Sequence, residues 1–559
     1  MIMTQKIIEL HLNKNEKLDE SLLVNSIYEV IEPLNIIYKS LIHINCHIIA
    51  NGEVLNLLRR CHAFGLNLAK IDIRQNSLQH KNLINSIFDF NGFKDFEKWN
   101  ESKKIKFLIN KIKSNKNLLS KKIKLNKENN ETLETFKMLK DLPEECLGSY
   151  IISNTSNISD ILSVMFLQKE TGVKNYLNIV PLFETLNDLN NADKIMEKLF
   201  RIPIYLKIFK RKQEIMIGYS DSSKDAGNFA ASWSIYQVQE KLYKISKRNN
   251  INLTLFHGRG GSIGRGGGPV YAALLSQPPG TVNGKTKVTE QGEVIQQKFS
   301  TESIAEYSLG TYIGSVLEAT LSPPIKPKKN WIKLMNEMST IGNISYKNQL
   351  INNPEFLRYY NTVTPQKILE KIFIGSRPTK RNKTNKIKAL SAIPWVFAWT
   401  QIRLILPAWL GTLEALEYGS EKNNLKFLKQ MFNKWPFFYQ MMDMLDMVLT
   451  KTDIRVIKFY ENCLADKNLK NIGNKLTKQL SLLIKLNKIL IPNKMINQRN
   501  EYRESVKIRN TYAETLNLLQ ANIIKKLNNN KMKKNEKENY NDAMMVTVAG
   551  IAAAMKNTG

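Results

Sequence analysis

The stretch IMIGYSDSSKDAG, residues 215–227, decides the fold, because an apolar run ends in a glycine and a cluster of polar residues follows it. This pattern predicts a short buried strand, then a turn, then the start of a helix. The same order recurs in LNLAKIDIRQNS (66–77), YLNIVPLFETLNDLNNA (176–192) and INLTLFHGRGG (251–261). The recurrence predicts an α/β barrel of the TIM type, in which the chemistry lies at the carboxyl ends of the strands.

Helical patterns fill most of the remaining chain. Apolar residues recur three and four apart before residue 70 and almost everywhere after residue 300, so we expect a mostly α protein built around the barrel. The expected regions are helices and the barrel strand with Arg74 (1–100), a Lys-rich helical excursion (101–150), the catalytic barrel portion with a glycine-rich loop (151–412), and a C-terminal helical region whose end docks into the body (413–559).

The composition is that of a globular protein, with 43% hydrophobic and 24% charged residues in a chain of 559. It excludes a disordered chain, a collagen and a coiled coil, and four cysteines are too few to hold a disulfide-stapled scaffold together. A net charge of +32 would fit a nucleic-acid partner. Lys and Asn are over-used along the whole chain, however, so we interpret the charge as compositional drift and expect no nucleic-acid partner.

The most hydrophobic stretch, AIPWVFAWTQIRLILPAWLG (392–411), is nearly long enough to span a bilayer. Gln401, Arg403 and Pro407 interrupt it, and an arginine in the middle of a span is costly in lipid. We therefore predict buried core and no membrane partner. The first 20 residues lack an uninterrupted apolar run and a small-residue cleavage site, so we expect no signal peptide and a cytoplasmic location.

The richest motif is FHGRGGSIGRGGGP, residues 256–269, in which seven of the eleven residues from Gly258 to Gly268 are glycine. Such a loop exposes backbone N–H groups and allows a ligand to approach closely, as at Gly258, Gly260 and Gly261. Arg259 and Arg265 add guanidinium groups suited to phosphate or carboxylate.

His257 stands at the entrance of this loop. A lone histidine is usually a satisfied core residue, but the neighbouring arginines favour a catalytic role here. The loop is not a dinucleotide fingerprint, because Ile263 stands where that motif needs glycine, and Pro279 excludes a phosphate-binding P-loop at the following Gly-Lys-Thr.

Two isolated carboxylates, Glu184 and Asp221, follow predicted strands. Oxygen ligands from separate strand ends suit Mg²⁺ or Mn²⁺ that is shared with a phosphorylated substrate. The structural alternatives are a helix N-cap for Asp221 and a capping or ion-pair role for Glu184. Lys224, three residues after Asp221, could meet a substrate anion or transfer a proton, although a solvated position is the usual one for a lone lysine.

A third group contains Arg74 in DIRQNS, Arg377 in IGSRPTKR, and Glu290 in VTEQGEV. Arginines gathered around a metal describe a pocket for a small anionic, phosphorylated substrate.

At these residues the sequence resembles the phosphoenolpyruvate carboxylase family. FHGRGGSIGRGGGP and GYSDSSKDAG are similar to that family's glycine-rich and lysine motifs. PLFETLNDL, VTEQGE, IGSRPTKR, AIPWVFAWTQIRLILPAWLG and the terminal MKNTG also match, in the family's order, so the resemblance covers essentially the whole chain.

The resemblance implies a cytoplasmic, typically tetrameric enzyme that joins bicarbonate to phosphoenolpyruvate and releases oxaloacetate and phosphate. In the family, residues matching Glu184 and Asp221 hold a divalent metal, and arginines matching Arg74, Arg259 and Arg377 bind the substrate. The residue matching Lys224 is an active-site lysine, and the one matching His257 places bicarbonate. Feedback by aspartate or malate uses the positions that match Arg265, Lys451, Arg509 and Asn557.

The sequence also departs from the family pattern. The family's N-terminal third, with a second active-site histidine in a Thr-Ala-His-Pro-Thr run, has no counterpart here, so the resemblance implies a barrel that is incomplete at its N-terminal side. Ser391 and Lys287 stand where arginine is usual. Two readings follow: a working carboxylase half that needs a separately made N-terminal fragment, or an inactive remnant that serves only as an assembly fragment.

Overall fold

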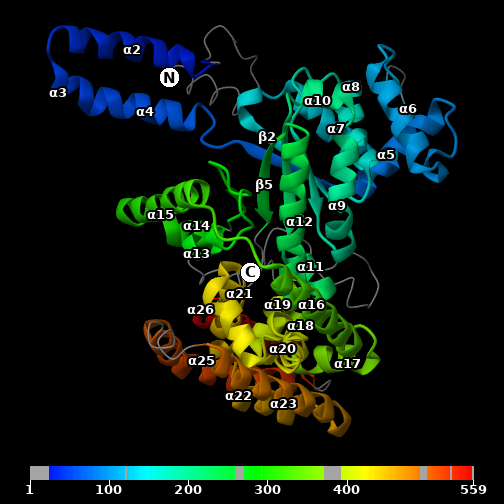
Figure 1. Ribbon diagram of the computed structural model, residues 1–559, viewed down its shortest axis with the longest axis vertical. Helices are drawn as coiled ribbons and strands as arrows, with labels where there is room; N and C mark the ends of the chain where they lie inside the picture. The colour runs from blue at the N-terminus through cyan, green and yellow to red at the C-terminus, as the bar shows by residue number, and fades with distance from the viewer. Residues whose placement is uncertain are drawn as a thin grey trace.

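The computed structural model describes residues 24, 26–119, 123–258, 270–290, 292–369, 392–491, 500–528 and 532–556. Figure 1 shows a sheet flanked by helices in the upper part of the molecule, a helical body below it, and a helical arm that projects from the top. Most of the chain is helical, as the sequence patterns predict.

The sheet has six strands that are all parallel and are ordered as they occur in the chain. They are β1 (Ile71–Asn76), β2 (Leu147–Ser153), β3 (Ile179–Phe183), β4 (Lys212–Gly218), β5 (Asn252–Gly258) and β6 (Lys287–Val288). Sequential order with parallel pairing is the topology of an α/β barrel. The described strands account for part of such a barrel, which agrees with the incomplete barrel that we expected.

Helices connect the strands, as parallel pairing requires. They are α5 (Ser77–Phe90), α6 (Glu101–Lys113), α7 (Lys127–Asp141), α8 (Ile158–Thr171), α9 (Leu186–Leu199), α10 (Pro203–Ile208), α11 (Ser220–Ala226) and α12 (Asn228–Arg248). Most of α8 is buried, which explains why its sequence has no polar face. A capping box between Thr185 and Asp188 starts α9 directly after β3, so the turn that carries Glu184 is fixed on both sides.

The lower body is a bundle of helices around an aromatic core that includes Trp331, Trp395, Trp399 and Trp435. Its helices are α16 (Lys329–Leu350), α17 (Pro354–Val363), α18 (Gln366–Leu369), α19 (Ala392–Gln401), α20 (Thr412–Lys434), α21 (Pro436–Lys451), α22 (Ile454–Leu464), α23 (Lys467–Leu490), α25 (Asn500–Leu527) and α26 (Lys534–Met555). The apolar stretch of α19 and the turn after it is buried in this core, as predicted. Helix α26 buries Met544, Val548 and Ile551 and so docks the end of the described chain.

Among the described residues, no single helix is long and apolar enough to cross a membrane. Two consecutive helical segments, Pro394–Gln401 and Leu406–Lys434, reach the length and apolar composition of a membrane span only when they are taken together. The chain bends by 113° between them.

Two further elements lie outside these layers. The arm consists of α2 (Tyr28–His43), α3 (His47–Ile49), a π-helical turn (Ala50–Val54) and α4 (Leu55–Phe64). A second projection consists of α13 (Val270–Leu275), α14 (Gly292–Phe299) and α15 (Glu302–Leu321). Both extend to the same side of the view in Figure 1.

A polar network inside the sheet joins its two outer strands. The ammonium nitrogen of Lys287, in β6, lies 3.2 Å from Asp72 Oδ2 in β1 and 3.1 Å from Glu214 Oε2 in β4. Ser149 in β2 completes the network, because its N–H donates to Asp72 (2.7 Å) and its hydroxyl donates to Glu214 (3.0 Å). A flat six-stranded sheet would separate its outer strands by roughly 24 Å. Because Lys287 reaches from β6 to Asp72 in β1, the sheet must be rolled, and the Lys287 side chain connects its two outer strands across the interior.

Replacing Lys287 with methionine is expected to lower the free energy of unfolding by about 1–2 kcal/mol, because two half-buried carboxylates lose their shared cation. Urea denaturation followed by circular dichroism measures this change. Lys285→Met is the matched control, since Lys285 is exposed and its amine contacts only the side chain of Asn252 among the described residues. Equal stability of the two variants would contradict the claim that the contacts of Lys287 stabilise the fold.

Candidate active site

The predicted site residues lie at one end of the rolled sheet. Arg74 is near the end of β1, Glu184 directly follows β3, and Asp221 and Lys224 lie in α11 directly after β4. His257 is the penultimate residue of β5. Since parallel strands end at the same edge, residues far apart in the sequence meet there.

Glu184 and Arg74 form the centre of this group. The Glu184 side chain is only 2% exposed, and its Oε1 lies 3.1 Å from Arg74 Nη2. Its other oxygen accepts the N–H of Asn154 at 3.2 Å, and Arg74 Nε donates to the Ser153 hydroxyl at 2.8 Å. The ion-pair alternative for Glu184 is therefore confirmed, and two predicted site residues are brought together.

Glycine allows the next strand to approach Glu184. A Cβ at Gly218 would lie 3.1 Å from the Cα of Glu184, which is closer than nearly all real contacts. On the far side of the turn, the N–H of Leu186 donates to Asp225 Oδ2 at 3.1 Å and so ties the start of α9 to α11. The same short helix carries Asp221 in its first turn. Glu184 and Asp221 are thus presented by adjacent strands.

The N-cap alternative for Asp221 is wrong. Tyr219 occupies the N-cap position of α11, and Asp221 lies inside the first helical turn. Helix α11 is also anchored from the lower body, because the buried Tyr346 hydroxyl donates to the carbonyl of Lys224 at 2.8 Å. Lys224 is therefore half-buried on a fixed helix, rather than in the solvated position usual for a lone lysine.

His257 is buried and its ring is held in place. Its Nδ1 lies 2.8 Å from the Tyr219 hydroxyl, and its carbonyl accepts the N–H of Thr289 at 2.9 Å. The neighbouring Gly258 packs closely on β4, since a Cβ there would lie 2.9 Å from the methyl carbon of Met216. His80, in contrast, is a core residue: burial and the charge of Lys81 lower its pKa to about 3, and it contacts the Tyr150 hydroxyl.

The remaining predicted residues are less closely joined to this group. The Glu290 carboxylate contacts Lys298 and the Tyr312 hydroxyl, which belong to α14 and α15. Several predicted residues lie outside the described residues: Arg259, Gly260, Gly261, Arg265, Arg377, Ser391 and Asn557.

Two carboxylates near the sheet end, Glu184 and Asp221, were expected to hold a hard divalent cation. Within the part of the chain that the structure describes, no three His, Cys, Asp or Glu residues gather as a metal site. Glu184 and Asp221 offer carboxylate oxygens, the ligands that Mg²⁺ prefers, and two protein ligands suit an ion whose other positions are taken by substrate and water. Both oxygens of Glu184 contact protein groups in the structure, namely Arg74 and the N–H of Asn154, so the metal that we expected stays a prediction.

A second cationic group lies in the lower body. The Arg403 side chain is fully buried, and its Nε donates to the carbonyl of Lys451 at 2.7 Å. Burial, then the charges of Arg509, Lys556 and Arg403, lower the pKa of Lys451 to about 8. One guanidinium nitrogen of Arg403 and one of Arg509 are buried without a partner among the described residues. Lys451, Arg509 and Arg403 thus belong to one basic cluster, in which their charges act on each other.

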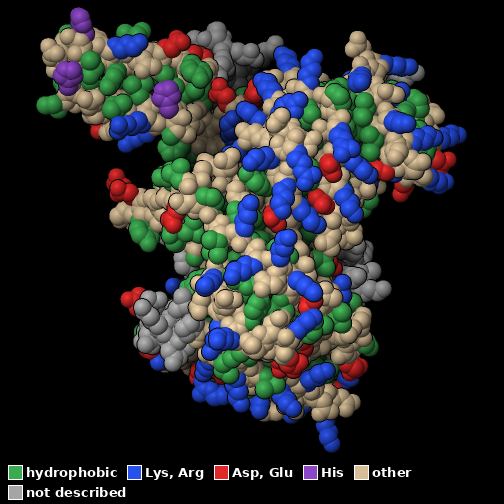
Figure 2. Space-filling model, viewed as in Figure 1, with side chains coloured by type: hydrophobic (Ala, Val, Ile, Leu, Met, Phe, Trp, Pro, Cys, Tyr) green, Lys and Arg blue, Asp and Glu red, His purple; other side chains and the backbone are tan. Residues whose placement is uncertain are grey.

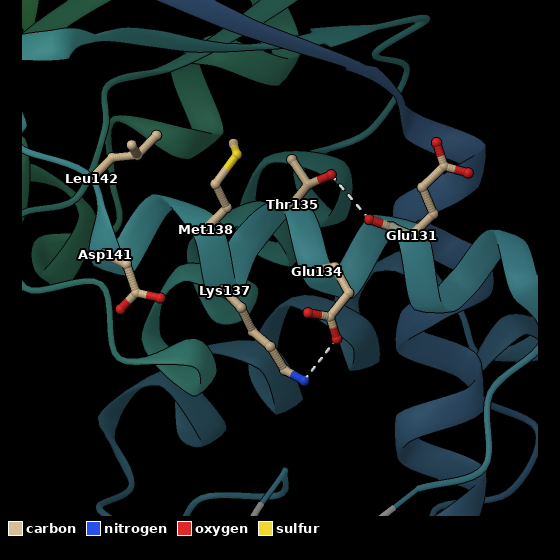
Figure 3. Close-up of a pocket in the computed structure, with 7 residues that line it drawn as sticks. All are labelled: Glu131, Glu134, Thr135, Lys137, Met138, Asp141 and Leu142. Carbon is tan, nitrogen blue, oxygen red and sulfur yellow. Dashed lines mark hydrogen bonds and ion pairs between the residues drawn. The ribbon is translucent and has the colours of Figure 1, made fainter. Parts of the chain in front are cut away.

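Surface depressions elsewhere are not part of either group. Figure 3 shows one that is lined by side chains of α7 and the residue after it, with an ion pair between Lys137 and Glu134 (2.9 Å). Another is lined by residues 423–434 of α20. Neither contains a predicted site residue.

Comparison with known proteins agrees with this geometry. The family model for phosphoenolpyruvate carboxylase matches residues 1–559. The chain belongs to the phosphoenolpyruvate carboxylase family. Relatives named phosphoenolpyruvate carboxylase include those of Marinomonas sp. (43% identical over 95% of this chain) and Hahella chejuensis (41% over 95%). In each case the match covers 60% of the relative, so this chain spans about three fifths of the length of these family members.

Sequence reasoning missed several residues of the site. Tyr219, Ser153, Asn154 and Tyr346 each bond a predicted residue. Tyr219 lies inside a quoted motif, but its contact with His257 depends on the pairing of β4 with β5, which aligns Ile217 with His257. The pairing of strands was the missing signal.

Replacing Arg74 with methionine is expected to destabilise the protein by about 2–3 kcal/mol at neutral pH, because the buried Glu184 carboxylate loses its cation. The double variant that also carries Glu184→Gln should regain most of the lost stability, because a neutral amide needs no counter-charge. Thermal unfolding of the single and double variants measures both effects.

The matched control is Arg201→Met, because Arg201 and Glu197 form an exposed pair on the surface with the same separation of 3.1 Å. It should change stability by less than about 0.5 kcal/mol. A similar loss in both arginine variants would contradict the special role of the buried pair.

Proposed function

We propose that this chain carries the catalytic part of a phosphoenolpyruvate carboxylase, which converts phosphoenolpyruvate and bicarbonate to oxaloacetate and phosphate and so fixes carbon for the tricarboxylic acid cycle. The observation that carries the proposal is the buried Arg74–Glu184 pair beside Asp221 and His257, at the carboxyl end of the rolled sheet. Family membership supports the same reaction.

Each residue of the site has a role in the proposed reaction. The phosphoryl group leaves the enol oxygen and joins a bicarbonate oxygen. The resulting carboxyphosphate gives CO₂ and phosphate, and C3 of the pyruvate enolate then bonds to the CO₂ carbon. Arg74, with Arg259 and Arg377, binds the anionic groups of phosphoenolpyruvate, and His257 places bicarbonate. Lys224 lies near the reacting groups on α11. A bound Mg²⁺ or Mn²⁺, held by Glu184 and Asp221, would offset negative charge on the phosphate and the enolate.

The contacts of His257 suit a positioning task. The Tyr219 hydroxyl holds Nδ1, and β5 fixes the backbone, so the imidazole keeps one orientation towards the sheet end. Glycines in residues 258–268 allow the backbone to approach the substrate closely. A closely covered site also excludes water, which would otherwise protonate the enolate.

We also propose that activity requires a companion polypeptide. This proposal rests on the resemblance alone, because the family's Thr-Ala-His-Pro-Thr run with its second active-site histidine does not occur in the sequence. The competing candidate is an inactive remnant, which is favoured by Ser391 at a position where the family pattern has arginine. By resemblance alone, we further propose a homotetramer in the cytoplasm.

We expect the purified chain alone to form no oxaloacetate, because the proposed reaction requires a companion polypeptide. Adding the part of the Marinomonas sp. relative that this chain does not match should restore turnover in the presence of Mg²⁺. Coupled reduction of oxaloacetate by malate dehydrogenase measures the rate. Asp221→Ala should abolish the restored activity, whereas Glu197→Ala, an exposed carboxylate on α9, should not.

Turnover by the chain without an added polypeptide would contradict the need for a companion. If the mixture stays inactive but becomes active with the Ser391→Arg variant, the unaltered chain is an inactive remnant. Unchanged turnover in Asp221→Ala would remove Asp221 from the site.

We propose that the basic cluster of Lys451 and Arg509 binds a dicarboxylate effector such as aspartate or malate, together with Arg265 and Asn557. One guanidinium nitrogen of Arg403 and one of Arg509 are buried without a hydrogen-bond partner among the residues that the structure describes, which supports an anionic ligand. Arg403 lies behind Lys451 and contributes further positive charge.

Effector affinity is expected to fall as the pH rises above about 8, because Lys451 then loses its proton and its charge. The dissociation constant should rise by up to about tenfold per pH unit over this range. Isothermal titration with L-aspartate at several pH values measures the trend. Lys451→Met should bind weakly at every pH, and Lys458→Met, an exposed lysine on α22, should behave like the natural chain.

Loss of the Lys451 proton has opposite effects on effector binding and on the free energy of unfolding: it weakens binding but stabilises the fold. The pKa of Lys451 is lower in the folded chain than its usual 10.5, so its burial destabilises the fold below about pH 8, and this penalty disappears as the pH rises towards 10.5. Lys451→Met should therefore be more stable than the natural chain at neutral pH. A pH-independent affinity with no gain in stability would contradict the buried charge.

A further inference from the structure

Asn154, directly after β2, has a backbone conformation that most residues avoid. Its φ is 55°, in the left-handed region, which glycine adopts freely and asparagine tolerates better than most other residues. The residue is half-buried, and β2 lies between β1 and β3, whose ends carry Arg74 and Glu184. Left-handed residues other than glycine persist only where surrounding contacts hold them, and they cluster at functional sites. The contacts of Asn154 show what this conformation achieves.

The turn at Asn154 changes the pairing of β2 with β3. The N–H of Tyr150 donates to the carbonyl of Asn178 at 2.8 Å, and parallel strands repeat this bond at every second residue. Regular pairing would therefore join the N–H of residue 154 to the carbonyl of Leu182. That carbonyl instead accepts the N–H of Thr155 at 3.3 Å. The turn thus releases the N–H of Asn154 from the sheet.

The released N–H of Asn154 donates to Glu184 Oε2 at 3.2 Å, while Arg74 binds the other oxygen of the same carboxylate. The preceding residue, Ser153, accepts a hydrogen bond from Arg74 Nε at 2.8 Å. Two successive residues of one turn therefore contact both members of the Arg74–Glu184 ion pair. Because each partner is held from a second direction, the pair has one preferred orientation at the sheet end.

Two hydroxyl groups hold the turn in this conformation. Ser77, the first residue of α5, is 5% exposed and donates to the carbonyl of Asn154 at 2.9 Å. The hydroxyl of the fully buried Thr155 donates to the carbonyl of Ile152 at 2.8 Å. Since α5 follows β1 directly, the ends of β1, β2 and β3 are joined at Asn154. A strained backbone persists where such restraints surround it.

We propose that Asn154 is a positioning residue of the carboxylase site: its left-handed turn directs an N–H to Glu184 and so fixes the orientation in which Arg74 meets phosphoenolpyruvate. The proposal rests on the proposed function, in which Arg74 binds an anionic group of this substrate. A carboxylate that is held at only one oxygen can rotate and draw the guanidinium group with it. Contacts at both oxygens order Arg74 before the substrate binds, which lowers the entropic cost of binding.

Orientation matters in this protein because positive charge is abundant. Figure 2 shows Lys and Arg side chains over much of the visible face, around the sheet and over the lower body alike. The chain has 82 Lys and Arg residues against 50 Asp and Glu residues, so it attracts anions at many places. Selective binding at one site then depends on a guanidinium group whose orientation matches a phosphate or carboxylate. The turn at Asn154 provides this order for Arg74.

Asn154→Gly and Asn154→Val test the proposal, because both remove the side-chain amide but only glycine adopts the left-handed turn without strain. Turnover is measured with the full chain mixed with the part of the Marinomonas sp. relative that it does not match. Asn154→Val should raise the KM for phosphoenolpyruvate about tenfold with kcat nearly unchanged. Asn154→Gly should keep the KM within about twofold of that of the unaltered chain.

Asn250→Val is the matched control. Asn250 has nearly the same left-handed backbone, with a φ of 53°, but it precedes β5 at the opposite end of the sheet. Valine should strain the fold at this position and leave the KM unchanged. Ser77→Ala removes only the hydroxyl that holds the Asn154 carbonyl, so it should raise the KM about threefold. This second variant decides the matter if Asn154→Val does not fold.

A double-mutant cycle in the full chain alone tests the contact without any turnover. Thermal unfolding is compared for Asn154→Val, Glu184→Met and the variant with both changes. Methionine offers no carboxylate oxygen to the N–H of residue 154, so valine should lower the Tm less in the Glu184→Met background than in the unaltered chain. Asn250→Val should lower the Tm equally in both backgrounds, because it lies at the other end of the sheet.

Three results would overturn the positioning role. They are an equal loss of Tm from Asn154→Val in both backgrounds, a KM that neither Asn154→Val nor Ser77→Ala changes, and an equally raised KM in Asn154→Gly, which would assign the effect to the side-chain amide. If the mixture forms no oxaloacetate even with the unaltered chain, the proposed function fails. The Tm cycle then still decides whether Asn154 holds Glu184.

Discussion

One ammonium group inside the sheet sets the geometry on which the rest of the structure depends. Lys287 binds the carboxylates of Asp72 and Glu214 and thereby holds β6 against β1 and β4 across the interior. Strand pairing alone fixes neighbours but not the curvature of the whole sheet. Because the sheet is rolled, the residues at its carboxyl end point towards a common centre.

At that centre, charge balance is achieved within the protein. The Glu184 carboxylate is surrounded by the Arg74 guanidinium and the N–H of Asn154, so it is buried without an unpaired charge. In the proposed reaction, Arg74 would also meet an anionic substrate, and Glu184 would meet a cation. The Arg74–Glu184 ion pair thus stabilises the free protein. In the proposed reaction, the same two side chains provide one positive and one negative charge for substrate and cation.

Local sequence patterns predicted much of the fold for a clear physical reason. Strands β3, β4 and β5 contain apolar runs that can be recognised in the sequence by themselves. Strand β1 (IDIRQN) also forms within the predicted stretch, but none of its residues is buried, so the expectation of a buried strand there was wrong. Strand β2 was missed because its sequence, LGSYIIS, follows Lys-rich helices and carries no charge at its end, although Tyr150, Ile151 and Ile152 favour a strand. Strand β6 has two residues, too few for any periodicity.

The site was predicted residue by residue, but its contacts were not. Arg74, Glu184, Asp221 and His257 stand out as polar residues after apolar runs, whereas the contact of Tyr219 with His257 depends on strand register. The bridge of Lys287 depends on the curvature of the whole sheet. Neither property is carried by a short stretch of sequence.

Helix α12 couples the unfolding of the sheet to the unfolding of the lower body. One part of it, with Ile235, Val238 and Leu242, belongs to the core around the sheet, while Phe229, Trp233 and Tyr236 belong to the aromatic core of the lower body. Trp233 and Tyr236 contact Trp435 at ring separations of 5.8 and 5.7 Å. Neither core can lose its packing without exposing a face of this shared helix. The sheet and the lower body are therefore not two independent units of cooperative unfolding.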